Sequence, residues 1–177
     1  MILAGRHSIS ALVAPLSVHA GGAIDRPVNF QGVLFTPGSR LESRFRFDSC
    51  HRTCRYDFFV SDSLTAGAGL TGKIRDASIR VTDGTSTAEK SNTGFVPLIH
   101  FRVSWFFAGP WGLLVEGDAL AAPQGRAEDV LAAPQYRIGD TVTVKAGYRM
   151  LEGGSDNDEV YTFSMFHYAL AGVIIRF

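Results

Sequence analysis

The sequence predicts an all-β fold, namely a closed eight-stranded antiparallel up-and-down transmembrane β-barrel, formed as a single domain over residues 1–177. Three observations favour it. Several segments alternate apolar and polar side chains over about ten residues or more, as membrane-crossing strands do. Short and long connections follow each other in alternation. No apolar run approaches the ~18 residues of a transmembrane helix, and a closed barrel is the other way to satisfy every backbone group in lipid.

The composition narrows the possible partners. The net charge is zero and the basic residues are scattered over both faces of the expected strands, so we expect no nucleic-acid partner. Cys50 and Cys54 lie four residues apart in one expected strand. Their Cα atoms would be roughly 13 Å apart, beyond the ~7 Å limit of a disulfide. We therefore expect two free thiols. No third or fourth metal ligand lies near them in the sequence, and we expect no cofactor.

We expect strands at residues 7–19, 40–60, 64–81, 94–107, 111–121, 128–138, 141–151 and 163–177. The first of these has an alternative, because residues 9–18 and the following Val18-His-Ala20 also fit a signal-peptide core and cleavage site. We favour the strand, because it gives an even strand number and Pro15 would break a signal helix. A signal for export would then lie upstream.

Turn chemistry separates the strands. We expect short turns at 61–63, 108–110 and 139–140, and longer connections at 20–37, 82–92, 122–126 and 152–160. Asp83-Gly84 and Gly139-Asp140 are typical turn sequences. Short turns on one side and longer loops on the other are the arrangement of outer-membrane barrels, and both termini then lie on the side of the short turns.

The two faces of each strand differ in polarity. In the strand at 94–107 one face carries Phe95, Pro97, Ile99, Phe101, Val103, Trp105 and Phe107, and the other carries His100, Arg102 and Ser104. The strands at 64–81, 111–121 and 141–151 alternate in the same way. Aromatic residues gather beside the short turns, as at a membrane interface: Phe58, Phe59, Trp105, Phe107, Trp111, Tyr136 and Phe177. The apolar face is therefore expected to contact lipid.

Four residues fit this pattern poorly. Pro15, Pro97 and Pro134 each remove a ladder hydrogen bond from an expected strand, so we expect bulges or kinks there. Arg52 falls on the apolar face, where an arginine in the middle of the bilayer would cost about 2–4 kcal/mol. We expect Arg52 to lie near an interface or the strand to shift register by a bulge.

The end of the chain carries the most specific motif. Phe177 is preceded at every second position by apolar residues, Ile175, Val173, Ala171 and Ala169, whereas Ile174 departs from the pattern. This segment resembles the last strand of bacterial outer-membrane β-barrels, and the whole chain is similar in architecture to small OmpA-, OmpX- or OmpW-like barrels. The resemblance implies a Gram-negative outer membrane, periplasmic termini, contact with outer-membrane lipid and reading of Phe177 by the barrel-insertion machinery. We expect a monomer.

Charged side chains are expected on the inward face at Lys73, Arg75, His100, Arg102, Glu116, Asp118, Lys145 and Arg149. An eight-stranded barrel is only wide enough to be filled by side chains, so we expect these charges to pair in a polar network that fills the lumen. A narrow conduit for small or apolar solutes, and acid–base catalysis by the neighbouring Glu116 and Asp118, are the alternatives.

The sequence gives weaker support for a hydrolase site or a calcium site than for the polar network. Ser164 and His167 differ by three positions and so point to opposite faces of a strand, which disfavours a lipid A-modifying hydrolase using Glu159. Asp156, Asp158 and Glu159 are weak candidates for a calcium site in what we expect to be a solvated loop. We expect a structural or interaction protein that acts through its outer loops rather than an enzyme, with a soluble ligand-binding barrel as the rival fold.

Overall fold

The computed structural model describes residues 2–3, 5–122, 125–157 and 160–176. The strands are β1 (Ile2–Leu3), β2 (His7–Ala14), β3 (Ser17–Ala23), β4 (Val28–Phe30), β5 (Val33–Phe35), β6 (Arg40–Val60), β7 (Leu64–Thr82), β8 (Thr87–Ala108), β9 (Trp111–Ala122), β10 (Gly125–Ile138), β11 (Val142–Asn157) and β12 (Val160–Ile175). In this part of the chain no helix has the length and hydropathy needed to cross a membrane.

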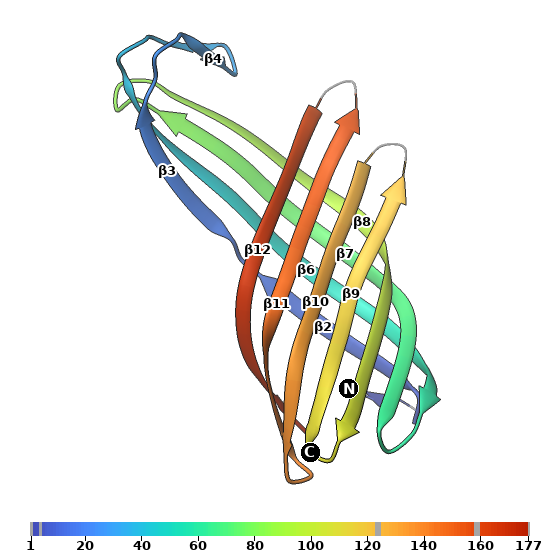
Figure 1. Ribbon diagram of the computed structural model, residues 1–177. Helices are drawn as coiled ribbons and strands as arrows, with labels where there is room; N and C mark the ends of the chain where they lie inside the picture. The colour runs from blue at the N-terminus through green and yellow to red at the C-terminus, as the bar shows by residue number, and fades with distance from the viewer. Residues whose placement is uncertain (1, 4, 123–124, 158–159, 177) are drawn as a thin grey trace. The chain divides into compact units, whose positions relative to one another are not determined.

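The strands form one large antiparallel sheet, whose hydrogen-bonded order is β1-β2-β6-β7-β8-β9-β10-β11-β12, with β3 paired to β6. β4 and β5 form a separate hairpin. Figure 1 shows β9 to β12 as successive neighbours. The all-β antiparallel prediction is confirmed. Among the described residues no ladder joins β12 to β1 or β2, so the closed eight-stranded barrel stays a prediction.

The chain divides into two compact units. Unit 1 comprises Met1–Ser10, Arg52–Thr71 and Pro97–Phe177, and unit 2 comprises Ala11–His51 and Gly72–Val96. β6, β7 and β8 are long, at 21, 19 and 22 residues, and each contributes one part to each unit.

In unit 1 the hairpins have well-defined registers. β11 and β12 pair from Val142↔Ile175 to Asn157↔Val160. Turns are present at both places expected, with connections at 109–110 and 139–141 instead of 108–110 and 139–140. Gly109 and Gly139 adopt positive φ angles of 57° and 62°, which favour glycine. The β8–β9 register shifts between Phe106 and Ala108, beside the first of these turns.

Two of the prolines have different consequences. Pro15 lies between β2 and β3, so the expected strand at 7–19 is divided in two. Pro134 lies within β10, opposite Leu113 of β9, and the register of β10 is the same on both sides of it. At Pro15 the strand is interrupted where we expected a bulge or kink. At Pro134 the strand continues with no shift of register.

Three of the expected long connections are shorter than the sequence suggests, so their predicted bounds are wrong. β7 ends at Thr82 and β8 begins at Thr87, which leaves a four-residue connection instead of 82–92. β10 begins at Gly125, and β11 continues to Asn157 through most of the expected loop at 152–160. The hydrogen bonds between strands are made by the backbone and do not depend on side-chain polarity. A hairpin can therefore continue through a segment whose side chains are polar on both faces and whose sequence resembles that of a loop.

Exposure along β6 changes in character. The exposed side chains of its N-terminal half include Arg40, Glu42 and Arg44, whereas those of its C-terminal end include Tyr56, Phe58 and Val60. Cys50 and Cys54 are exposed free thiols, as expected, and Arg52 is exposed between them. In unit 1 the face opposite the exposed one carries a small apolar cluster, Leu114, Leu131 and Ala133, against which Leu170 packs.

Candidate functional site

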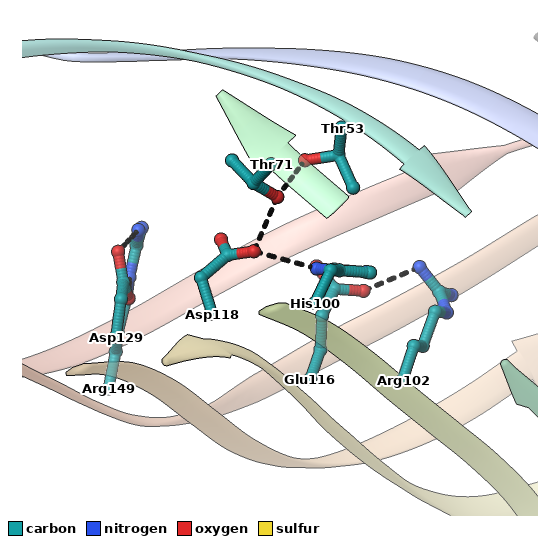
Figure 2. A network of polar contacts seen from close by, with 8 residues as sticks. All are labelled: Thr53, Thr71, His100, Arg102, Glu116, Asp118, Asp129 and Arg149. Atoms are coloured by element: carbon teal, nitrogen blue, oxygen red, sulfur yellow. Dashed lines mark hydrogen bonds and ion pairs between the residues drawn. The ribbon is translucent and has the colours of Figure 1, made fainter. Parts of the chain in front are cut away.

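The candidate site of unit 1 is a polar network on the less exposed face of its sheet. Its members occupy alternate positions of six strands, β6 to β11, because side chains two residues apart in a strand share a face. They are Thr53, Thr71, His100, Arg102, Ser104, Glu116, Asp118, Asp129, Gln135 and Arg149, of which eight appear in Figure 2.

Asp118 is the centre of the network. Its Oδ1 atom lies 2.6 Å from Thr71 Oγ1 and 2.9 Å from His100 Nδ1 (Figure 2). Thr71 Oγ1 also lies 2.7 Å from Thr53 Oγ1. Since Thr71 donates its single proton to the carboxylate, Thr53 must be the donor to Thr71. His100 and Asp118 are only 5% and 8% exposed, and Thr71 is fully buried.

Two arginine–carboxylate pairs flank this centre. Arg102 Nη1 lies 2.6 Å from Glu116 Oε2, across the β8–β9 ladder in which the two residues are directly opposed. Arg149 contacts both oxygens of Asp129 at 2.6 Å, through Nε and Nη2. Bidentate pairs of this kind fix geometry more strongly than single contacts.

Neutral and aromatic partners extend the network toward the short turns. Gln135 Nε2 donates to Ser104 Oγ at 2.8 Å, and both side chains are buried. The guanidinium of Arg137 lies 3.8 Å from the centre of the Phe106 ring, a cation–π contact.

Five of the eight charged residues expected in the lumen are brought together in unit 1: His100, Arg102, Glu116, Asp118 and Arg149. Lys145 shares their face and lies against Gly172, and it makes no ion pair within 4 Å among the described residues. Lys73 and Arg75 lie in unit 2, where Lys73 Nζ is 5.4 Å from the centre of the Phe47 ring and Arg75 reaches Asn92.

The other predicted site residues are placed as follows. Asp156 lies in β11, opposite Tyr161 of β12. Phe177, Asp158 and Glu159 lie outside the described residues.

Five of the ten network residues were not predicted as site residues, although Ser104 was placed on the polar face of its strand. Thr53, Thr71, Ser104, Asp129 and Gln135 contribute contacts as short as those of the predicted charges. Thr53, Thr71, Ser104 and Gln135 carry hydroxyl or amide groups, which a search for charged residues passes over. Asp129 is charged, but no inward face was assigned to the expected strand at 128–138. The positions of these five residues could have identified them. Each lies on the same face of the sheet as a predicted charged residue of its own strand or of a neighbouring strand.

The opposite face of unit 1 is apolar and exposed. Trp105, Phe107 and Trp111 are each at least half exposed beside the turn at 108–110. Trp105 packs against Phe107 with ring centres 5.3 Å apart, and Trp111 packs against Tyr136 at 4.8 Å. Farther from the turns, exposed Tyr148 hydrogen-bonds to His167 Nδ1, and their rings are stacked.

The chemistry available to the network is limited by the order of its groups. Thr71 and His100 both bond to the carboxylate of Asp118, so the hydroxyl lies on the acid and not on the imidazole. An activated nucleophile needs its hydroxyl on the base. Within the described residues His100 Nε2 has no hydrogen-bond partner. The arrangement therefore suits mutual neutralisation better than acyl transfer.

No protein-family model, curated protein or solved structure matches this chain.

Proposed function

We propose that the protein is an integral outer-membrane β-barrel of eight closed antiparallel strands, with a structural or interaction role carried by its outer loops and a lumen filled by the polar network. Both termini are periplasmic, the protein is a monomer in outer-membrane lipid, and the insertion machinery reads its C-terminal strand at Phe177.

The single observation that supports this proposal best is the distribution of exposure on β8. Ile99, Trp105 and Phe107 are 57%, 50% and 56% exposed, whereas His100 and Ser104 on the other face are 5% and 8% exposed. A water-soluble barrel would bury the first set and expose the second. In a bilayer the same distribution is favourable, because lipid solvates the apolar side chains and the polar ones pair with each other.

The pairing within the network supports a filled lumen rather than an enzyme or a channel. Three carboxylates, Glu116, Asp118 and Asp129, each have a basic partner on a neighbouring strand. Such pairs hold register between neighbouring strands. A barrel with a filled lumen has no open passage for solutes. We therefore assign its role to interactions made by the outer loops.

Tryptophan fluorescence tests the membrane location. The chain has two tryptophans, Trp105 and Trp111, both exposed beside one short turn. In vesicles, lipids brominated near the headgroup should quench them more than lipids brominated near the chain end. In a Trp105→Phe/Trp111→Phe background, Phe101→Trp should be quenched best by the deep bromines, and Asn92→Trp should be quenched by neither. Emission from Phe101→Trp that responds only to aqueous acrylamide would contradict insertion.

Two assays separate the proposed role from its rivals. Planar bilayers containing the protein should show no steady conductance steps, because the network fills the lumen; regular steps would favour the conduit. Lipid A from cells with and without the protein should give the same mass spectrum, whereas a lost or added acyl chain would favour the enzyme.

A further inference from the structure

Among the described residues, one edge of β8 in unit 2 has no strand hydrogen-bonded beside it. β8 is hydrogen-bonded to β7 on one side, and its ladder with β9 begins only at Ile99. In the described structure residues 87–96 therefore have a neighbour on one side alone. An unpaired strand edge is a template for another strand, unless it is blunted by proline, several charges or a bulge. This stretch contains no proline and only one lysine and one glutamate.

One face of unit 2 beside this edge is basic. Arg75 Nη2 lies 3.4 Å from Asn92 Oδ1, and a Cβ atom at Gly94 would lie 3.2 Å from Arg75 Nε. The guanidinium of Arg75 therefore extends from β7 over the edge strand, and Gly94 leaves the space for it. Lys90 lies on the same face, two positions before Asn92.

Neither cation has an acidic partner among the described residues, and Arg75 Nε is buried with no hydrogen-bond acceptor. Of the nearby carboxylates, Glu89 directly precedes Lys90 in β8 and so points to the opposite face of the strand, and the three aspartates are engaged elsewhere. Asp48 and Asp76 contact Arg46. Asp76 also accepts a hydrogen bond from the hydroxyl of Thr93, whose side chain lies on the face of β8 opposite to Lys90 and Asn92. Asp83 accepts backbone N–H groups within its own turn.

We propose that residues 87–96 of β8 bind an extended acidic peptide segment of a partner protein by strand addition. The peptide continues the sheet through its backbone, and two carboxylates on one of its faces meet Arg75 and Lys90. Gly94, over which Arg75 lies, and Lys90 are four positions apart. Because strands pair residue by residue, the two acidic residues of the partner are also four positions apart. This deepens the proposed interaction role, on which it rests, by naming a surface and a class of partner.

The test uses the full chain folded in detergent micelles and three fluorescent ten-residue threonine–valine peptides. The first has glutamates four positions apart, the second has lysines at those positions, and the third is the glutamate peptide with alternate backbone nitrogens methylated. Fluorescence anisotropy should show saturable binding of the first peptide, and binding of the other two at least about tenfold weaker, since one lacks the charge match and the other the backbone donors.

Variants locate the site. Arg75→Gln and Lys90→Gln should each weaken binding of the glutamate peptide several-fold, whereas Arg44→Gln, on an exposed part of β6, should leave it unchanged. Far-UV circular dichroism confirms that each variant is folded. Equal binding of the methylated peptide would mean attraction of anions without strand addition and would overturn the proposal, as would unchanged binding by Arg75→Gln. The peptide assay in micelles and the tryptophan-quenching assay in vesicles are independent measurements. A failure of peptide binding would therefore reject the strand-addition site without changing the evidence for the barrel.

Discussion

Thr71 on β7 and Asp118 on β9 are joined by a 2.6 Å hydrogen bond although β8 lies between their strands. In a flat sheet, residues two strands apart are about 9.5 Å apart, which two short side chains cannot bridge so closely. The sheet of unit 1 must therefore curve toward this face. The contact ties three strands together, because His100 of β8 bonds to the same carboxylate oxygen.

Asp118→Ala should be strongly destabilising. It leaves Thr71 and His100 buried without their acceptor, and the loss of one partner from a buried polar pair costs about 3 kcal/mol. Urea unfolding in lipid vesicles measures the change. Asp62→Ala, in the exposed turn after β6, is the matched control and should change the free energy of unfolding by less than about 0.5 kcal/mol. Equal effects of the two substitutions would contradict the central place of Asp118.

Arg149 and Asp129 should be energetically coupled. Arg149→Met strands the buried carboxylate of Asp129 and should cost about 3–5 kcal/mol in the free energy of unfolding. Asp129→Leu leaves the half-buried guanidinium of Arg149 unpaired and should cost less, because water still reaches part of that side chain. The double variant should be more stable than either single variant, because no unpaired charge remains. A double-mutant cycle measures the coupling, and simple additivity would show that the bidentate contact does not form.

Gly147 should not tolerate a side chain. A Cβ atom there would lie 2.3 Å from the Ala132 carbonyl oxygen and 2.5 Å from Ala133 Cα, which are backbone atoms that cannot turn aside. Gly147→Ala should push β11 from β10 and reduce the yield of folded protein. Gly153→Ala in the same strand meets nothing within 4 Å and is the control. Heat-dependent mobility in gel electrophoresis reports the folded fraction, and equal fractions would refute the close approach.

Asp83 should titrate below its ordinary range. Hydrogen bonds from the backbone N–H groups of Ser86 and Thr85 stabilise its carboxylate and lower its pKa. Because the pKa of the folded state is depressed, the stabilisation of the turn is present above the pKa of the unfolded chain and is lost as the pH falls through the folded value. Carbon NMR of the Asp83 carboxyl group during an acid titration measures it. A midpoint at or above that of an unstructured peptide containing residues 80–88 would contradict the hydrogen bonds.

The alternation of apolar and polar side chains was enough to predict most of the sheet. A strand whose two faces lie in different environments alternates in polarity along its sequence. The alternation located β6 and the strands that follow it, and the turns at Gly109 and Gly139. It failed where both faces are polar. Residues 87–93 of β8 resemble a loop in sequence, yet they continue the strand, and the polarity pattern holds no information about backbone pairing.

The candidate site was predictable in its charges and not in its partners. The pair Arg102 and Glu116 follows from polarity alone, since both lie on the polar face of adjacent strands. The contact from Thr71 to Asp118 depends on the curvature of the sheet, which no local pattern encodes. The pairing of Arg149 with Asp129 depends on the β10–β11 register, which places Asp129 opposite Leu151 and so diagonally beside Arg149.

The change along β6 from charged to apolar exposed residues sets how thick a membrane the proposed barrel can fit. From Arg52 to Val60 the strand rises roughly 26 Å, and at a tilt of about 40° this spans roughly 20 Å of bilayer. A thicker bilayer would have to thin around the protein or take the guanidinium of Arg52 into hydrocarbon. Thin membranes would hold such a chain more stably than thick ones, so the position of a single arginine would help to decide in which compartment it accumulates.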